Sequence, residues 1–194
     1  MIRKLLIFCF IFQVQISYSN ELEKGMFALE MEDYERALYY LSFEAAQGNS
    51  TAQYNLGLMY KNGIGVDKDF NEAHGWFILA SDNDHMLSKY ALGLMYYKGE
   101  GIRKNYSKAM NLFLDASYMG HPASQINVGN MFYFGHGVGK NYPKAHMWWS
   151  FAKEKGVEAA FSNLTMIENK MTNNQLFEAQ RLFNNCQQKT LPKC

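Results

Sequence analysis

The chain has almost no excess charge, no long apolar run and few cysteines. Its 194 residues include 19 basic and 18 acidic side chains, which gives a formal net charge of +1. Proteins that bind nucleic acids or membrane surfaces need a basic face, so this balance argues against both classes. The mostly apolar stretch Leu5–Val14 is too short for a membrane-spanning helix. We therefore expect no nucleic-acid partner and no stable membrane insertion of the mature chain.

The first nineteen residues are typical of a secretory signal peptide. Arg3 and Lys4 form a positive start, the apolar stretch follows, and Ser17 and Ser19 place small residues where a signal peptidase reads them. Cleavage near Ser19 leaves about 175 residues, enough for one domain with its own core. An uncleaved N-terminal anchor is the alternative. We expect an exported protein, periplasmic or, as the alternative, secreted.

Of the three cysteines, only Cys186 and Cys194 follow the predicted signal peptide. An even number of cysteines in an exported protein favours a disulfide. The bridge would tie the last helix to the C-terminal tail and stabilise the fold by roughly 2–3 kcal/mol. The alternative is that the two thiols link to another chain.

Three segments repeat one pattern at intervals of 36 residues, with no insertion or deletion between copies. The first copy contains Leu56, Gly57, Tyr60, Gly63, Gly65, Val66, Asp69, Phe70, Ala73, Trp76 and Ala80. Fixed periods of this size indicate stacked helical hairpins. We predict an all-α fold, a right-handed α-solenoid of three full repeats with capping helices at both ends.

The predicted organisation has six parts. They are a signal peptide (1–19), an N-terminal capping hairpin (20–51), three repeats (52–87, 88–123 and 124–159), and C-terminal capping helices with a tail (160–194). Both terminal parts look like more polar variants of the repeat, as the ends of a stack require.

Each repeat is predicted to hold a helix A, a glycine turn and a helix B. The three helices A cover about 51–61, 87–97 and 123–133. Gly57 and its copies lie inside helix A, where glycine costs about 1 kcal/mol relative to alanine. This repeated penalty indicates close backbone contact between helices A and B. Gly63 and Gly65 supply the positive φ values that end helix A.

The start of helix B and the linker to the next hairpin carry their own signals. Asp69, Asn105 and Asn141 can cap helix B. Glycines at 48, 120 and 156 lead into the next hairpin, and Asp84 replaces the glycine in one linker. We expect the linker around Asp84 to be looser than the others.

These motifs resemble the Sel-one-like repeat (SLR) family, which is related to the tetratricopeptide repeats. The segment Ala52–Tyr60 with Gly63, Gly65 and Val66 matches the first half of the family signature. Lys108-Ala109 and Lys144-Ala145 match the second half, where Glu72-Ala73 departs. The resemblance covers roughly residues 20–185. It implies an all-α superhelix that contacts other proteins, commonly in exported or periplasmic bacterial proteins, and it implies no catalytic activity and no cofactor.

Several motifs suggest chemistry but have simpler interpretations. The run 135–140 (GHGVGK) looks like a phosphate-binding loop, yet it lacks the following Ser/Thr and the preceding strand, so we interpret it as a repeat turn. His74 and His146 share one repeat position but lie two repeats apart, too far for one metal ion. The carboxylates of the first hairpin indicate a solvated cap. Met59 and its copies fill the core or, alternatively, form a flexible binding surface.

The inner, concave face of the predicted superhelix is the candidate site for a protein or peptide partner. Positions 52, 56 and 60 of helix A face the hydrophobic core, so positions 55, 58 and 62 point away from it. Tyr97 and Tyr133 lie next to these positions and add aromatic rings to the same face. The candidate residues are Asn55, Leu58, Asn62, Leu94, Tyr97, Lys98, Asn127, Asn130, Tyr133 and Phe134. Amides bind peptide backbone and rings hold apolar side chains, a combination suited to an extended peptide. The alternative is ordinary helix surface.

We therefore expect a non-catalytic adaptor or scaffold. One alternative is a regulatory or structural subunit of an envelope complex, and another is a secreted effector that engages host proteins. A cell-wall-active enzyme is the weakest alternative, because no nucleophile motif accompanies the carboxylates.

Overall fold

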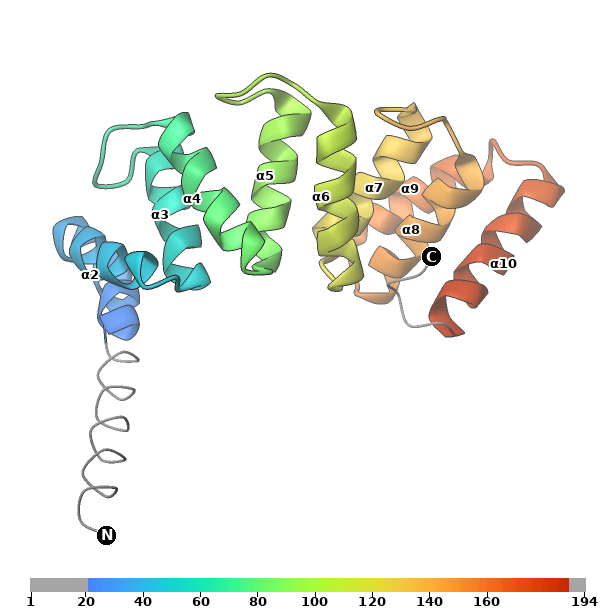
Figure 1. Cartoon of the computed structure of the whole chain (residues 1–194). Helices are drawn as coiled ribbons and strands as arrows, with labels where there is room; N and C mark the ends of the chain where they lie inside the picture. The colour runs from blue at the N-terminus through green and yellow to red at the C-terminus, as the bar shows by residue number, and fades with distance from the viewer. Residues whose placement is uncertain (1–20, 189–194) are drawn as a thin grey trace, which may run out of the picture. The chain divides into compact units, whose positions relative to one another are not determined.

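The computed structural model describes residues 21–188, and all regular secondary structure in this range is α-helical. A first helix spans residues 21–30. It is followed by α2 (Tyr34–Ala46), α3 (Ser50–Asn62), α4 (Phe70–Asp82), α5 (Met86–Lys98), α6 (Tyr106–Tyr118), α7 (Pro122–Phe134), α8 (Tyr142–Glu154), α9 (Glu158–Glu168) and α10 (Asn173–Gln188). The antiparallel helix pairs follow one another along the chain (Figure 1). This is the predicted array of helix-turn-helix repeats. The predicted signal peptide and Cys194 lie outside the described residues.

The repeat pattern sets the helix boundaries. Helices α3, α5 and α7 are the predicted helices A, and α4, α6 and α8 are the helices B. Each of the six has 13 residues, and in both series the starting residues are 36 apart. The motif and the helix starts share the same 36-residue interval, so each copy of the motif forms the same hairpin.

The described residues divide into two compact units, the first ending at Ser88 and the second beginning at Lys89. In the described part of the first unit, the helix at 21–30 and helices α2 to α4 share a core centred on fully buried Leu41 and Leu56. Met59 is also buried there, and Trp76 packs against it. The core combines small alanines with large side chains, which lets neighbouring helices interlock.

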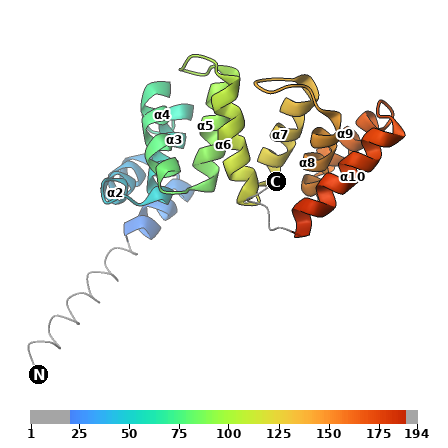
Figure 2. The same ribbon diagram turned by 45° about the vertical axis from the view of Figure 1, so that its right-hand side comes forward.

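The second unit has a larger aromatic core. Phe113, Met131 and Trp148 are buried in one cluster, and Trp149 is buried in another with Ala145 and Leu164. Helix α10 packs along α8 (Figure 2) and adds Leu182 and Phe183 to the first cluster. Met95 and Met131 are completely buried. Like Met59, they therefore fill the core and form no flexible binding surface.

The glycine inside each helix A makes room for a ring. A Cβ on Gly57 would lie 2.5 Å from the ring of Phe77, and a Cβ on Gly93 would lie 2.5 Å from that of Phe113. In the third copy the neighbour is the indole of Trp149, 2.4 Å from a Cβ on Gly129. The expected close contact is therefore present, but an aromatic side chain of helix B lies on the backbone of helix A, where we expected two backbones to meet.

The glycine turns and the caps of helix B are confirmed. Gly63 and Gly65 have φ values of 72° and 69°, and their copies have similar values. The side chains of Asp69, Asn105 and Asn141 each accept a hydrogen bond from a backbone N–H in the first turn of helix B. These bonds satisfy donors that have no partner within the helix.

The expectation of a looser linker at Asp84 is wrong. Asp84 adopts the left-handed conformation of the glycines it replaces, with φ 55°. The amide of Asp84 donates to the carbonyl of Ser81 and that of His85 to Ala80, as in the other linkers. Asn83 adds hydrogen bonds to the carbonyls of Gly48 and Leu79 at 3.4 and 3.2 Å. Aspartate tolerates this conformation better than most residues, so the turn keeps its geometry.

Two histidines cap helices A, a feature that the sequence reasoning missed. In the linker before α7, Nδ1 of His121 accepts a hydrogen bond from the backbone N–H of Ser124 at 3.3 Å, and the Ser124 hydroxyl lies 2.8 Å from the same nitrogen. His85 and Ser88 repeat the arrangement at 3.3 and 3.0 Å. The signal in the sequence was His-x-x-Ser, repeated at 36 residues.

Candidate partner-binding surface

The predicted site residues lie on helices A of both units. Asn55, Leu58 and Asn62 belong to α3 in the first unit. In the second unit, Leu94, Tyr97 and Lys98 belong to α5, and Asn127, Asn130, Tyr133 and Phe134 to α7. Each unit therefore presents its own part of the predicted surface.

Exposure divides the predicted residues into two classes. Asn62, Lys98 and Phe134 occupy one repeat position at the end of helix A, and all three are exposed. The other predicted residues are half-buried. Ala91, which takes the place of Asn55 and Asn127 in the middle repeat, is buried with only 6% of its surface exposed. The surface is therefore most accessible at the C-terminal end of each helix A.

Tyr97 is part of an aromatic cluster that joins two successive hairpins within the second unit. Its hydroxyl lies 2.9 Å from Nδ1 of His136, which comes from the glycine turn of the following repeat. The His136 ring stacks on Tyr106 with centroids 4.7 Å apart and planes 6° apart. Phe134 stacks on His136 at 5.5 Å. Burial, together with nearby Tyr106, raises the pKa of the Tyr97 hydroxyl. Tyr97 is therefore engaged in packing beneath the predicted binding surface, whereas Phe134 is exposed on that surface.

Tyr133 forms a second cluster. Its ring stacks on Tyr142 at 5.5 Å and lies 5.7 Å from Trp149. The Lys170 ammonium donates a hydrogen bond of 2.5 Å to the Tyr133 hydroxyl, and this bond raises the pKa of the lysine. Tyr133 thus connects α7 with the chain after α9. Like Tyr97, it is held by packing and holds Phe134 in place at 4.9 Å.

The remaining accessible groups on α7 are an aromatic ring and amides. Phe134 is 56% exposed, and Asn127 and Asn130 lie half-buried on the same helix. On α3, Asn55 uses one N–H of its Nδ2 to donate to the carbonyl of Thr51 at 2.8 Å, so its side-chain oxygen and its second N–H are the groups it can offer to a partner. A ring with neighbouring amides can hold an apolar side chain and peptide groups.

The turn at 135–140 is a repeat turn, as interpreted from the sequence. The amides of Gly135 and His136 both donate to the carbonyl of Met131 and so close helix α7. A Cβ on Gly137 would lie 2.7 Å from the backbone of Tyr106, so this part of the turn packs on the preceding helix B. The geometry leaves these groups engaged within the protein, where a phosphate-binding loop would direct its amides at the ligand.

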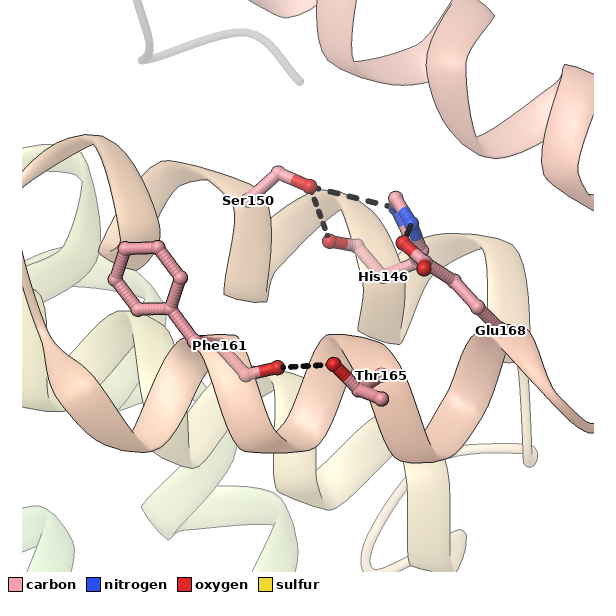
Figure 3. Close-up of polar contacts among 5 residues, drawn as sticks. All are labelled: His146, Ser150, Phe161, Thr165 and Glu168. Carbon is pink, nitrogen blue, oxygen red and sulfur yellow. Dashed lines mark hydrogen bonds and ion pairs between the residues drawn. The ribbon is translucent and has the colours of Figure 1, made fainter.

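One Ser-His-Glu arrangement lies on α8 and α9 (Figure 3). Nε2 of His146 lies 2.9 Å from Oε1 of Glu168, and Nδ1 lies 3.3 Å from the Ser150 hydroxyl. That hydroxyl donates to the carbonyl of His146 at 2.9 Å, a bond within the same helix. Its single proton is thus directed at a carbonyl of its own helix. The arrangement links α8 to α9 as an ion pair or hydrogen bond.

Metal ions and membranes are two further classes of candidate partner for residues 21–188. In this range no group of three or more histidine, cysteine, aspartate or glutamate side chains is placed to hold a metal ion. None of the helices described is both long and apolar enough to cross a membrane.

The chain belongs to the Sel1 repeat family. The family profile matches residues 20–49, 50–85, 87–121 and 122–157. The match includes the first hairpin, which we described as a cap, so this hairpin is a repeat that lacks the glycine-pair loop. Among solved structures, a Sel1 repeat protein from Oxalobacter formigenes is 28% identical with a TM-score of 0.72, over 84% of this chain and 74% of that one.

A second solved structure shows the same fold. It is c5321, a protective antigen present in uropathogenic Escherichia coli strains and displaying an SLR fold. It is 22% identical with a TM-score of 0.55, and the match covers 91% of this chain but only 46% of that protein. No curated protein matches the chain significantly. Sel1 repeat proteins generally mediate protein–protein interaction, which agrees with the chemistry of the helix A surface.

Proposed function

We propose that the chain is a non-catalytic interaction module that binds an extended segment of a partner protein along helices A of the second unit, α5 and α7. The observation that carries this proposal is Phe134. This large apolar side chain is 56% exposed, yet its ring is held by Tyr133 at 4.9 Å and by His136 at 5.5 Å. An exposed ring in a fixed position loses little conformational entropy on binding, which is typical of an interface anchor.

Asparagines of the same surface complete the proposed recognition. Asn127 and Asn130 lie on the helix that ends in Phe134 and offer both donors and acceptors to peptide groups. Asn55, Leu58 and Asn62 offer a similar mixture in the first unit. Leu94 and Lys98 are their counterparts on α5.

The protein is further proposed to act after export, in the periplasm or beyond the cell, because its first nineteen residues have the pattern of a signal peptide. A disulfide between Cys186 and Cys194 would suit that compartment. Cys186 is 5% exposed, and its sulfur lies 3.6 Å from that of Met147 in the core of the second unit.

Site-specific photocrosslinking tests the proposal. A photoreactive phenylalanine analogue at position 134 or 130 is expected to capture a partner in native cells. The matched control is the same analogue at Asn111 or Asp115, which are exposed on α6. Equal capture from both helices would contradict the assignment to helices A. Capture from α6 alone would place the partner on helices B.

A further inference from the structure

The net charge of the chain is close to zero, but acidic residues are concentrated in its first half and basic residues in its second half. Within residues 21–88 there are four basic and twelve acidic side chains, a formal charge of −8. Within residues 89–188 there are eleven basic and six acidic side chains, a formal charge of +5. Seven of the acidic residues lie in the first hairpin, which has only Lys24 and Arg36 as basic residues. This hairpin is thus a strongly acidic surface.

The same hairpin exposes large apolar side chains. Tyr39 is 71% exposed, Met31 63%, Phe27 58% and Phe43 48%. We expected a polar cap at this end, and the acidic residues are present, but they surround apolar groups. Monomeric proteins seldom expose several neighbouring large apolar side chains unless these serve an interaction.

Phe27, Met31 and Tyr39 border two adjoining hollows on the hairpin formed by the first helix and α2, the blue helices of Figure 1. One hollow, of about 360 Å³, is lined by Phe27, Met31 and Tyr40, with Ala28 and charged neighbours. The other, of about 380 Å³, lies at the start of α2 and is lined by Tyr39 and Tyr40 together with the charged side chains of Asp33, Glu35 and Arg36. Tyr40 lines both hollows, and its ring meets that of Tyr39 edge to face, with centroids 5.3 Å apart.

The two cations beside the hollows are already paired within the hairpin. Lys24 Nζ lies 2.7 Å from Glu21, and Arg36 Nε lies 3.4 Å from Asp33. The carboxylates at positions 23, 30, 32 and 35 are exposed around them. The field at this surface is therefore negative, and a partner that brings positive charge is attracted.

We propose that this acidic hairpin face binds a basic amphipathic helical segment of a partner protein. Apolar side chains of the segment fill the hollows beside Met31 and Tyr39, and its lysines or arginines meet the surrounding carboxylates. The flexible methionine side chain adapts to differently shaped apolar anchors, and a groove between two helices suits a third helix. This surface is separate from the helix A surface of the proposed function and stands without it.

Binding of a designed peptide to the purified protein tests the proposal. The probe is a fluorescent amphipathic helix of about 18 residues made of leucine and lysine, and its counterpart has glutamate at every lysine. We expect the lysine peptide to bind and the glutamate peptide not to bind. The double variant Met31→Ser/Tyr39→Ser should weaken binding at least about tenfold, the loss of two apolar anchors. Higher salt should weaken it as well, because the charges are exposed.

The matched control is Phe177→Ser, which removes a side chain 74% exposed on α10 of the second unit. It should leave peptide affinity unchanged. All substituted side chains are exposed, and circular dichroism melting verifies that each variant is folded. If the serine variant unfolds, the charge-reversal variant Glu30→Lys/Glu32→Lys replaces it and should also weaken binding of the lysine peptide. The proposal is overturned if the hairpin variants bind as tightly as the wild type. It is also overturned if sedimentation shows self-association that Met31→Ser/Tyr39→Ser abolishes, because the occupant is then a second copy of the chain.

Discussion

The indole of Trp149 lies directly on the backbone of Gly129, so that a Cβ at position 129 would be 2.4 Å from its Cδ1 and Nε1 atoms. The indole N–H also donates to the carbonyl of Ile126 at 3.2 Å, which fixes the ring against helix α7. The ring that the glycine accommodates therefore has little freedom to move away from an added methyl group.

Gly129→Ala should destabilise the protein despite the higher helix propensity of alanine. Overpacking of a rigid core costs about 1–3 kcal/mol, against a propensity gain of about 1 kcal/mol, so a net loss of up to about 2 kcal/mol is expected. Denaturant unfolding followed by circular dichroism measures it. Gly75→Ala on α4 is the control, because nothing lies within 4 Å of a Cβ there. It should stabilise the protein, and a similar gain for Gly129→Ala would show that Trp149 can move.

Much of the fold could be predicted because the same motif recurs at a fixed spacing in the sequence. Copies of one motif 36 residues apart fixed the helix pairs, the glycine turns and the caps at Asp69, Asn105 and Asn141. The role of Gly57 could be predicted only in part. Its position indicated a close approach, but the ring that approaches it is 20 residues away and belongs to the packing between helices.

The candidate site was harder to predict for a physical reason. The sequence pattern tells which residues of helix A face away from its own hairpin, but not which of them the next hairpin covers. Tyr97 was predicted as a binding residue, yet the turn of the following repeat packs against it, and His136 of that turn forms a hydrogen bond with its hydroxyl. Phe134 stays exposed because it lies at the end of its helix. Side-chain coverage depends on long-range packing that a 36-residue period does not encode.

The caps formed by His85 and His121 should make the stability pH-dependent. Burial lowers the pKa of both imidazoles from the ordinary value of 6.5. Each Nδ1 accepts a backbone N–H, which requires that nitrogen to be unprotonated. The unfolded chain therefore binds more protons than the folded one just below pH 6.5, and stability falls on acidification. It should be at its full value above pH 6.5 and decline as the pH drops towards the lowered pKa.

His85→Asn/His121→Asn isolates this effect, because asparagine caps a helix without titrating in this range. The variant loses the ring contacts with Tyr54 and Tyr90 at every pH, so the slope of unfolding free energy against pH is the readout. The slope between pH 5 and 7 should be smaller than in the wild type. Identical slopes would mean that these histidines do not titrate differently on folding.

The linker glycines should be required for their backbone conformation alone. Gly120 has φ 89°, and nothing lies within 4 Å of a Cβ added there. Gly120→Ala should therefore destabilise the protein by about 1 kcal/mol through backbone strain without a steric clash. Gly120→Asn should cost less, since Asp84 already adopts φ 55° at the equivalent position. Thermal unfolding compares the two, and an equal loss would contradict the explanation given for Asp84.

Glu44 departs from the repeat in the core of the first unit. The equivalent positions in the following repeats are Ala80, Ala116 and Ala152, all completely buried. Glu44 is 3% exposed, and among the described residues its Oε1 is buried without a hydrogen-bond partner, while Oε2 accepts from Nδ2 of Asn49 at 3.2 Å. Burying a polar atom without a partner costs about 1–3 kcal/mol, more when it is charged.

Glu44→Ala should therefore raise the free energy of unfolding at pH 7 by roughly 1 kcal/mol or more, since it removes that cost and restores the residue of the other repeats. The lost hydrogen bond to Asn49 is a small opposing effect, because the Asn49 side chain keeps its bonds to the amides of Thr51 and Ala52. Glu35→Ala, at an exposed position of the same helix, should change stability by less than about 0.5 kcal/mol. If Glu44→Ala destabilises the protein instead, the buried carboxylate holds the first hairpin to α3, and its cost is repaid by contacts that alanine cannot make.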